Sequence, residues 1–331
     1  MKKWVLILFL VISISALGQE TQSVKKVDWN GYTQLRVSSN FEDNTTVMLR
    51  RLKFWLYSTP EFSPHWSYKV QVLFTSWMQE KFFLQEAHLI YKTGLFSFDI
   101  GQFIPCYSLQ WTQPDYQIAA IERANVINTL FPNASLGIRD LGGQINFHTK
   151  NKFIETSLGA FNGYGIMEYR FNSSGYMLTH RTAFNIPLAK NKFQFGYSLQ
   201  FREAEDMQLK HLLPDSVLFT GQDIRYNLFA LFKTRHWALQ AEYLTADLNG
   251  KKAQGFYVLS TINFKKSQVV FGVEQYEDLI AETNNQPHYR IGYNYLINKD
   301  KIKLFLDNYF QIIDGSMENY YASVQLQLFF N

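Results

Sequence analysis

Basic side chains within alternating apolar and polar segments are the residues of this chain whose spacing suggests chemistry. A row of fixed positive charge raises the local concentration of anions and excludes cations. In segments such as 29–38 and 47–59, a period-two pattern places the basic residues on the polar side, opposite the apolar side chains. The candidates for attracting anions, all on such segments except Arg123 in a long connection, are Arg36, Arg51, Lys53, Lys69, Arg123, Arg181, Arg225 and Arg290.

The alternative is that these charges only solvate a wide polar interior and pair with carboxylates on the same side. Four of the cations fall within the first three segments, and this concentration favours anion attraction. The carboxylates available for pairing are Glu86, Asp99, Asp140 and Glu242.

Little in the sequence favours catalysis. The histidines are spread one per segment or connection, without the H-E-x-x-H spacing of a zinc site, and no G-x-S-x-G motif occurs. A barrel hydrolase would need a Ser–His pair, for which His88 and His148 are the candidate histidines. Because Cys106 is the single cysteine, neither an intramolecular disulfide nor a multi-cysteine metal site can form. We expect no enzyme activity, no metal and no cofactor.

The elements that must position the basic residues are about sixteen alternating segments rich in aromatic residues. Phe, Tyr and Trp make up 17% of the chain, a content that suits aromatic girdles at two bilayer interfaces. The alternation predicts strands at residues 29–38, 47–59, 65–75, 82–93, 95–104, 139–149, 153–162, 177–188, 192–202, 222–234, 236–246, 254–264, 267–276, 288–297, 301–312 and 319–330.

The connections between these predicted strands divide by length. Short ones include 150–152, 190–191 and 265–266, and long ones include 105–138, 171–176, 203–221 and 278–287. Counting from the first strand, every long connection falls on one side, which is typical of a transmembrane antiparallel β-barrel with short periplasmic turns and long extracellular loops. The apolar sides then face lipid, and the polar sides face an aqueous lumen. A water-soluble sandwich would alternate as well, but would not separate its turns by length.

The third external connection, 105–138, is the longest. It carries apolar residues such as Trp111, Ile127 and Phe131, and loops of this length are usually functional. An apolar loop is poorly suited to water, so we expect it to fold into the lumen and narrow it. Glu122 and Arg123 would then lie near the constriction.

Residues 1–18 resemble a secretory signal, with Lys2 and Lys3 before an apolar core and Ala16 and Gly18 at the cleavage positions. The apolar run is too short for a membrane anchor. We expect a short periplasmic segment at 19–28, a barrel at 29–331, and export to the outer membrane of a Gram-negative cell.

The last strand ends in Phe330 before Asn331, which resembles the signal read by the barrel-insertion machinery. The net charge of +4 gives no reason to expect nucleic acid as a partner.

Several motifs in the first half of the chain occur in a characteristic order. They are LRRLKF at 49–54, PEFSPHWSYKVQ at 60–71, EAHL at 86–89, IGQFIP at 100–105, IER at 121–123, RDLGG at 139–143 and GAFNG at 159–163. Together they resemble the phosphate-selective porin O/P family of outer-membrane porins. The match in order and spacing covers residues 30 to 170.

This resemblance implies a sixteen-stranded, trimeric barrel with the third loop folded inward as an eyelet. It also implies an arginine ladder along the pore, with counterparts here in Arg36, Arg51 and Lys69. The lysine cluster of the family has no counterpart, because the cations of the long loop are Arg123 and Arg139. A broader pore for anions or small solutes therefore fits better than phosphate specificity.

The leading hypothesis is a passive porin for small anions, phosphate among them, or polar solutes. Its partners would be outer-membrane lipid, the solutes and two further copies of the chain in a homotrimer. A non-conducting structural or adhesive barrel is the alternative, and an outer-membrane barrel hydrolase is less favoured.

Overall fold

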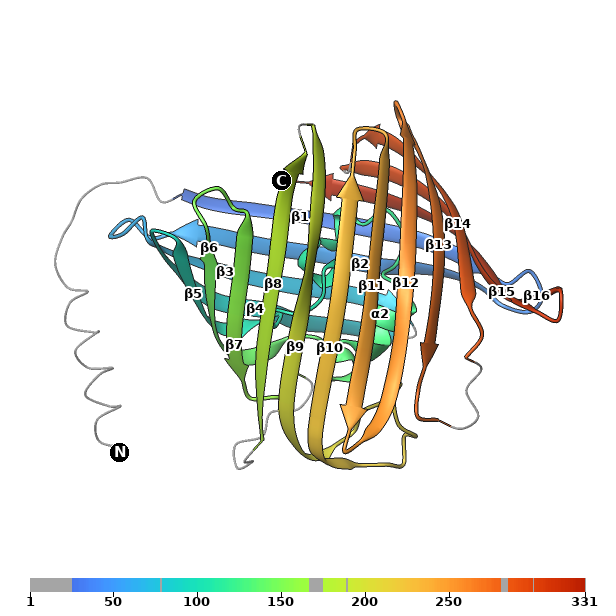
Figure 1. Ribbon diagram of the computed structural model, residues 1–331. Coiled ribbons are helices and arrows are strands. Elements are labelled where there is room, and N and C mark those ends of the chain that lie inside the picture. The colour runs from blue at the N-terminus through green and yellow to red at the C-terminus, as the bar shows by residue number, and fades with distance from the viewer. Residues whose placement is uncertain are drawn as a thin grey trace.

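The computed structural model describes residues 26–77, 79–166, 175–188, 190–280, 285–299 and 301–330. Within these residues, sixteen antiparallel strands follow one another around a closed barrel (Figure 1). The barrel closes where β1 (Lys26–Ser39) pairs with β16 (Ser316–Phe330). The predicted all-β barrel of about sixteen strands is therefore confirmed. The expected signal at 1–18 and the residues 19–25 lie outside the described residues.

The observed strands agree closely with the alternation in the sequence. Most predicted bounds are off by a few residues at most; β1 begins at Lys26 instead of 29, and β9 continues to Met207 instead of ending at 202. The remaining strands are β2 (Thr45–Thr59), β3 (Trp66–Trp77), β4 (Gln79–Thr93), β5 (Phe96–Phe103), β6 (Asp140–His148), β7 (Ile154–Phe161), β8 (Tyr176–Leu188), β9 (Asn191–Met207), β10 (Phe219–Lys233), β11 (Trp237–Leu248), β12 (Lys251–Phe264), β13 (Ser267–Glu277), β14 (His288–Asn298) and β15 (Ile302–Ile313).

Side chains alternate between the inside and the outside of the barrel as the sequence predicts. On β9, Gln194, Ser198 and Gln200 are buried inside, whereas Phe195 and Leu199 are exposed outside. Period-two alternation of this kind gives an apolar exterior and a polar interior. No helix in the described residues is long and apolar enough to cross a membrane.

The long connections lie on one side of the barrel, but that side also carries tight turns. β11 and β12 are joined by Asn249 and Gly250, and β15 and β16 by Asp314 and Gly315. All four residues have positive φ, between 52° and 87°, as two-residue hairpin turns require. The separation of turns by length is therefore incomplete, and the loop predicted at 203–221 shortens to 208–218.

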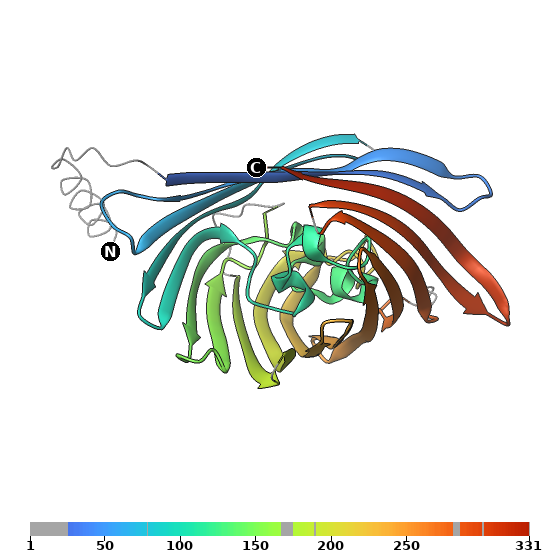
Figure 2. The ribbon, with the colours of Figure 1, turned by 90° about the horizontal axis from the view of Figure 1, so that it is seen from above.

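Residues 104–139, which we call the inward loop, fold into the barrel between β5 and β6 (Figure 2). The inward loop contains η1 (Gln110–Thr112), η2 (Asp115–Gln117), α2 (Asn125–Leu130) and η3 (Ala134–Leu136). Its apolar side chains, with Ile127, Leu130 and Phe131 fully buried, form one cluster with Leu244 and Tyr257 of the barrel wall. Burial of each such side chain is worth about 1.5–3 kcal/mol, so the predicted inward folding is confirmed and has a clear driving force.

Candidate functional site

A β-bulge in β2 directs two neighbouring arginines into the lumen. Gln34 of β1 pairs with Arg51, but the next residue of β1 pairs with Leu49, so the pairing register skips Arg50, which is the extra residue of the bulge. Such an extra residue interrupts the alternation locally, which lets Arg50 and Arg51 point to the same side. Strict alternation in the sequence predicted Arg51 inside and missed Arg50. The adjacent pair was itself a signal, because one of two successive arginines in a regular strand would face lipid at a cost of about 2–4 kcal/mol at the midplane.

The carboxylate of Glu122, on the inward loop, is the common partner of these arginines. Its Oε1 lies 2.6 Å from Nη2 of Arg36 and 2.5 Å from Nε of Arg50, and its Oε2 lies 2.6 Å from Nη2 of Arg51. Arg290 of β14 donates to the backbone carbonyl of Glu122 at 2.8 Å. Four cations from three strands therefore meet one loop residue.

The arginines keep Glu122 ionised. Burial alone would raise the pKa of this carboxyl group, but attraction by Arg51, Arg50 and Arg36 outweighs burial and holds the pKa well below its usual range. Because the cations outnumber the carboxylate three to one, the group as a whole keeps a positive charge.

A second acidic residue of the inward loop, Asp115, pairs with Lys53 of β2 and with Arg123 of the loop itself. Burial raises the pKa of Asp115, and Arg123 and Lys53 lower it by more, so it lies well below the usual aspartate value. The guanidinium of Arg123 lies over the ring of Trp111, 3.9 Å from its centroid. Lys53 and Arg123, both predicted site residues, are therefore brought together by one carboxylate.

Glu86 of β4 forms a third group with Lys69 and Arg139. Its Oε2 lies 2.5 Å from Nζ of Lys69, and its Oε1 lies 3.4 Å from Nη2 of Arg139. A second bulge, at Gln85 opposite the step from Gln71 to the next residue of β3, turns Gln85 and Glu86 inward together. Glu86 therefore pairs with basic residues of the wall, as the alternative prediction from the sequence has it.

Arg181 and Arg225, also predicted to line the pore, lie under the inward loop. Arg225 is 1% exposed, pairs with Asp223 at 2.8 Å and donates to the carbonyls of Leu130 and Phe131. Arg181 donates to the carbonyl of Ser108 at 3.2 Å. Both residues hold the backbone of the loop, so they fix its position.

Arg202 and Glu242 hold the loop in the same way. Arg202 was missed as a site residue, and Glu242 was predicted only as a carboxylate that could pair with the basic residues. Arg202 of β9 is fully buried and donates to the carbonyl of Pro132 at 2.5 Å. Glu242 of β11 accepts from the backbone N–H groups of Leu109 and Gln110, both at 2.8 Å. Their inward direction follows from alternation, but their contact with the loop depends on where the loop lies.

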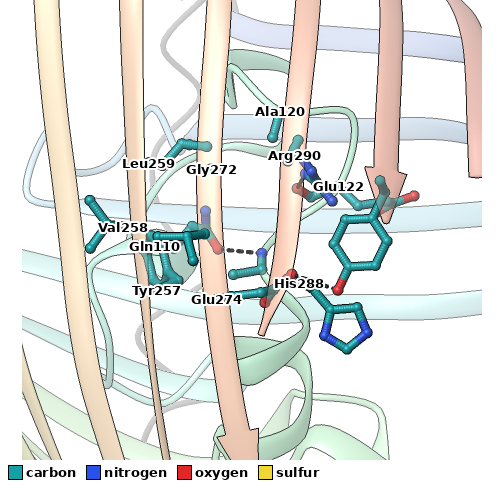
Figure 3. A pocket seen from close by; sticks show the side chains of 13 residues that line it. Gln110, Ala120, Glu122, Tyr257, Val258, Leu259, Gly272, Glu274, His288 and Arg290 are labelled. Carbon is teal, nitrogen blue, oxygen red and sulfur yellow. Dashed lines mark hydrogen bonds between the residues drawn. The ribbon is translucent and has the colours of Figure 1, made fainter. Parts of the chain in front are cut away.

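Glu274 ties α2 to the wall beside a small pocket. Its carboxylate accepts from the N–H of Val126 at 3.1 Å and from the hydroxyl of Tyr309 at 3.0 Å. Figure 3 shows this pocket, whose lining also includes Arg290 and His288. Its volume of about 20 Å³ is sufficient for little more than one water molecule, so it does not hold a solute.

A larger cavity of about 400 Å³ lies between the inward loop and the wall formed by β1 to β6. We call it the lumen cavity. The charged clusters around Asp115 and Glu86 line it, together with aromatic residues from both the wall and the loop. The lining residues used below are Tyr32, Lys53, Trp55, Lys69, Glu86, His88, Asp99, Asp115, Tyr116 and Arg139.

The candidate histidines of the hydrolase hypothesis are not joined to serine. Nδ1 of His148 lies 3.1 Å from the carbonyl of Thr149. The ring of His88 stacks on Phe103 with centroids 5.1 Å apart, and its Nδ1 lies 3.9 Å from Oδ1 of Asp99. Across the described part of the chain, no group of three or more His, Cys, Asp or Glu residues could hold a metal ion.

Comparison with known proteins identifies the fold. No protein-family model and no curated protein matches the sequence. Among solved structures, OmpF of Salmonella typhi in complex with daunomycin superposes with a TM-score of 0.68 at 11% identity, covering 92% of this chain and 98% of that one. The fold is that of the outer-membrane porins.

Two further structures agree with this assignment. OmpT, an outer membrane protein of Vibrio cholerae in its trimer form, gives a TM-score of 0.65 at 9% identity and covers 93% of this chain and 100% of that one. A mutant of the Rh. blastica porin gives 0.56 at 10% identity, covering 92% and 100%. At these identities the likeness establishes the fold alone, and the resemblance to the phosphate-selective porin O/P family stays a prediction.

Proposed function

We propose that this protein is an outer-membrane porin through which small anions and polar solutes diffuse passively. The observation that carries the proposal is the meeting of Glu122 with three arginines inside a closed barrel with an apolar exterior. An inward loop held against a basic wall narrows the lumen and surrounds the narrowing with charge. The porin folds of the structural neighbours support the same function.

Selectivity is proposed to favour anions weakly. Arg36, Arg50 and Arg51 share one carboxylate, and Lys53 and Arg123 share Asp115. Each of these carboxylates faces more cations than it can neutralise, which leaves a positive potential along the wall. Because each cation already has an acidic partner, these residues favour a broad pore over a dedicated phosphate site.

Assembly and location are part of the proposal. Export by the signal at 1–18 and recognition of the last strand by the insertion machinery would place the barrel in the outer membrane. The apolar exterior suits lipid and also contact between copies. The trimer form of the Vibrio cholerae protein supports a homotrimer.

A non-conducting structural barrel is the second candidate function. Buried hydrogen bonds from Arg202 and Arg225 to backbone carbonyls fix the inward loop. A loop held in this way could close the lumen. Planar-bilayer recordings on heat-modifiable, folded protein separate the two candidates. Stepwise conductance of defined size supports the porin, and silence from folded protein at the same concentration supports the structural barrel. Hydrolysis of a lipid ester by the same sample would reveal an enzyme.

A further inference from the structure

We infer that the lumen cavity is a binding subsite for a small sugar, a ring-shaped solute with several hydroxyl groups. The inference rests on the proposed porin function, because it names the class of solute that the constriction would retain. The volume of the lumen cavity, about 400 Å³, lies within the range of small-molecule sites, roughly 300–1,000 Å³. Three features of its lining point to this ligand: an aromatic surface, a set of paired charges and an unpartnered histidine.

The aromatic surface combines residues from the wall and the loop. Trp55 of β2 and Tyr116 of the inward loop are stacked, with centroids 6.1 Å apart and planes at 14°. Tyr32 of β1 lies close to both, at 6.3 Å and 5.8 Å. Tyr32 is fully buried, whereas Trp55 and Tyr116 are half-buried, so part of their apolar surface is left against water in the lumen. The C–H face of a sugar ring is an apolar surface of matching shape.

The charged residues of the cavity are already paired. Lys53 is bound to Asp115, and Lys69 and Arg139 are bound to Glu86. A hydroxyl group both donates and accepts hydrogen bonds, so a polyol can join such pairs without separating them. A compact anion such as phosphate would have to compete with Asp115 and Glu86 for the same cations and lie beside their negative charge. The lining therefore suits a hydroxyl-rich solute better than a compact anion.

His88 supplies the observation that the fold itself does not explain. Both of its ring nitrogens are buried, and neither has a hydrogen-bond partner among the residues that the structure describes. Nδ1 lies 3.9 Å from Asp99, too far for a hydrogen bond. A buried polar atom without a partner costs about 1–3 kcal/mol. His88 lines the lumen cavity, so a ligand hydroxyl would satisfy one of these nitrogens once the ring turns toward the cavity.

The test is titration of the detergent-folded, full-length protein with maltose by isothermal titration calorimetry, and a parallel titration with inorganic phosphate. We expect maltose to bind more tightly than phosphate. Trp55→Ala should weaken maltose binding at least tenfold, and Trp55→Phe should weaken it less. Trp66→Ala, which removes an exposed tryptophan from the neighbouring strand β3, is the matched control and should bind as the wild type does.

The outcomes separate this inference from the proposed pore. Tighter binding of phosphate, or no maltose binding by folded protein that conducts potassium chloride, overturns the sugar site and leaves the porin standing. Maltose binding that survives Trp55→Ala also overturns it. Maltose binding lost in Trp55→Ala by a protein without conductance supports the sugar site and contradicts the pore. Heat-modifiability on gels confirms that each variant is folded before titration.

Discussion

The carboxylate of Glu122 lies 2.6 Å from the guanidinium of Arg51, although Glu122 belongs to the inward loop and Arg51 to β2. The contact joins the element that narrows the lumen to the wall that charges it. The position of the loop and the charge of the pore therefore depend on the same residues. A substitution of Glu122 or Arg51 should alter both the loop position and the pore charge.

Replacement of Glu122 by glutamine is expected to increase anion preference. The change removes the negative charge that pairs directly with Arg36, Arg50 and Arg51, so the local potential becomes more positive. We expect the chloride-to-potassium permeability ratio, measured from reversal potentials in planar bilayers, to rise several-fold. Glu61→Gln, at an exposed position of the turn between β2 and β3, is the control and should leave the ratio unchanged. An unchanged ratio in Glu122→Gln would contradict the assignment of Glu122 to the constriction.

Deletion of Arg50 should leave the barrel folded. Arg50 is the extra residue of the bulge, so its removal restores a regular pairing of β1 with β2 and keeps Lys53 inside. Deletion of Leu52, in the regular part of the strand, should impair folding because a one-residue slip exchanges inner and outer side chains. The heat-dependent gel shift measures both variants. Loss of the folded band in the Arg50 deletion alone would show that the bulge is structurally required.

Charge at the constriction should resist mild acid. The pKa of Glu122 lies well below the ordinary value of 4.5 because of Arg51, Arg50 and Arg36. An ionised carboxylate with a lowered pKa stabilises the fold at any pH above the ordinary pKa. This stabilisation is lost only as the pH falls through the lowered pKa. Single-channel conductance and selectivity should therefore be constant between about pH 7 and 5. A selectivity change with a midpoint at or above 4.5 that vanishes in Glu122→Gln would contradict this account.

Removal of the Arg225 side chain should loosen the inward loop. Arg225→Ala leaves Asp223 with a weaker ion pair to Arg202 and frees the carbonyls of Leu130 and Phe131. Breaking a buried ion pair typically costs about 3–5 kcal/mol, so the temperature of the gel shift should fall and open-channel current noise should rise. Arg235→Ala, at an exposed position between β10 and β11, should change neither. Equal stability of both variants would contradict an anchoring role for Arg225.

Much of the barrel follows from local rules in the sequence. Alternation gives the strands and their faces, because each side chain meets either the lumen or the outside. Arg50 escaped prediction because a bulge is defined by pairing with a neighbouring strand and not by one strand alone. The tight turns at Asn249–Gly250 and Asp314–Gly315 did carry a local signal, since Asn-Gly and Asp-Gly favour two-residue hairpins.

The inward loop marks the limit of such reasoning. Its apolar content predicts that it leaves the water, but its exact position depends on partners distant in the sequence, such as Arg202, Arg225 and Glu242. For this reason the sequence predicted that Arg225 points inward, but not that it lies under the loop and anchors it. The convergence of Arg36, Arg50 and Arg51 on Glu122 is likewise visible only when strands and loop are placed together.

The most direct test of the central claim is the reversal potential of single channels under a gradient of potassium chloride. A weakly anion-selective pore with a basic constriction predicts a reversal potential displaced toward the chloride equilibrium value, and a larger displacement in Glu122→Gln. Displacement toward the potassium value, or no current from folded protein, would contradict it.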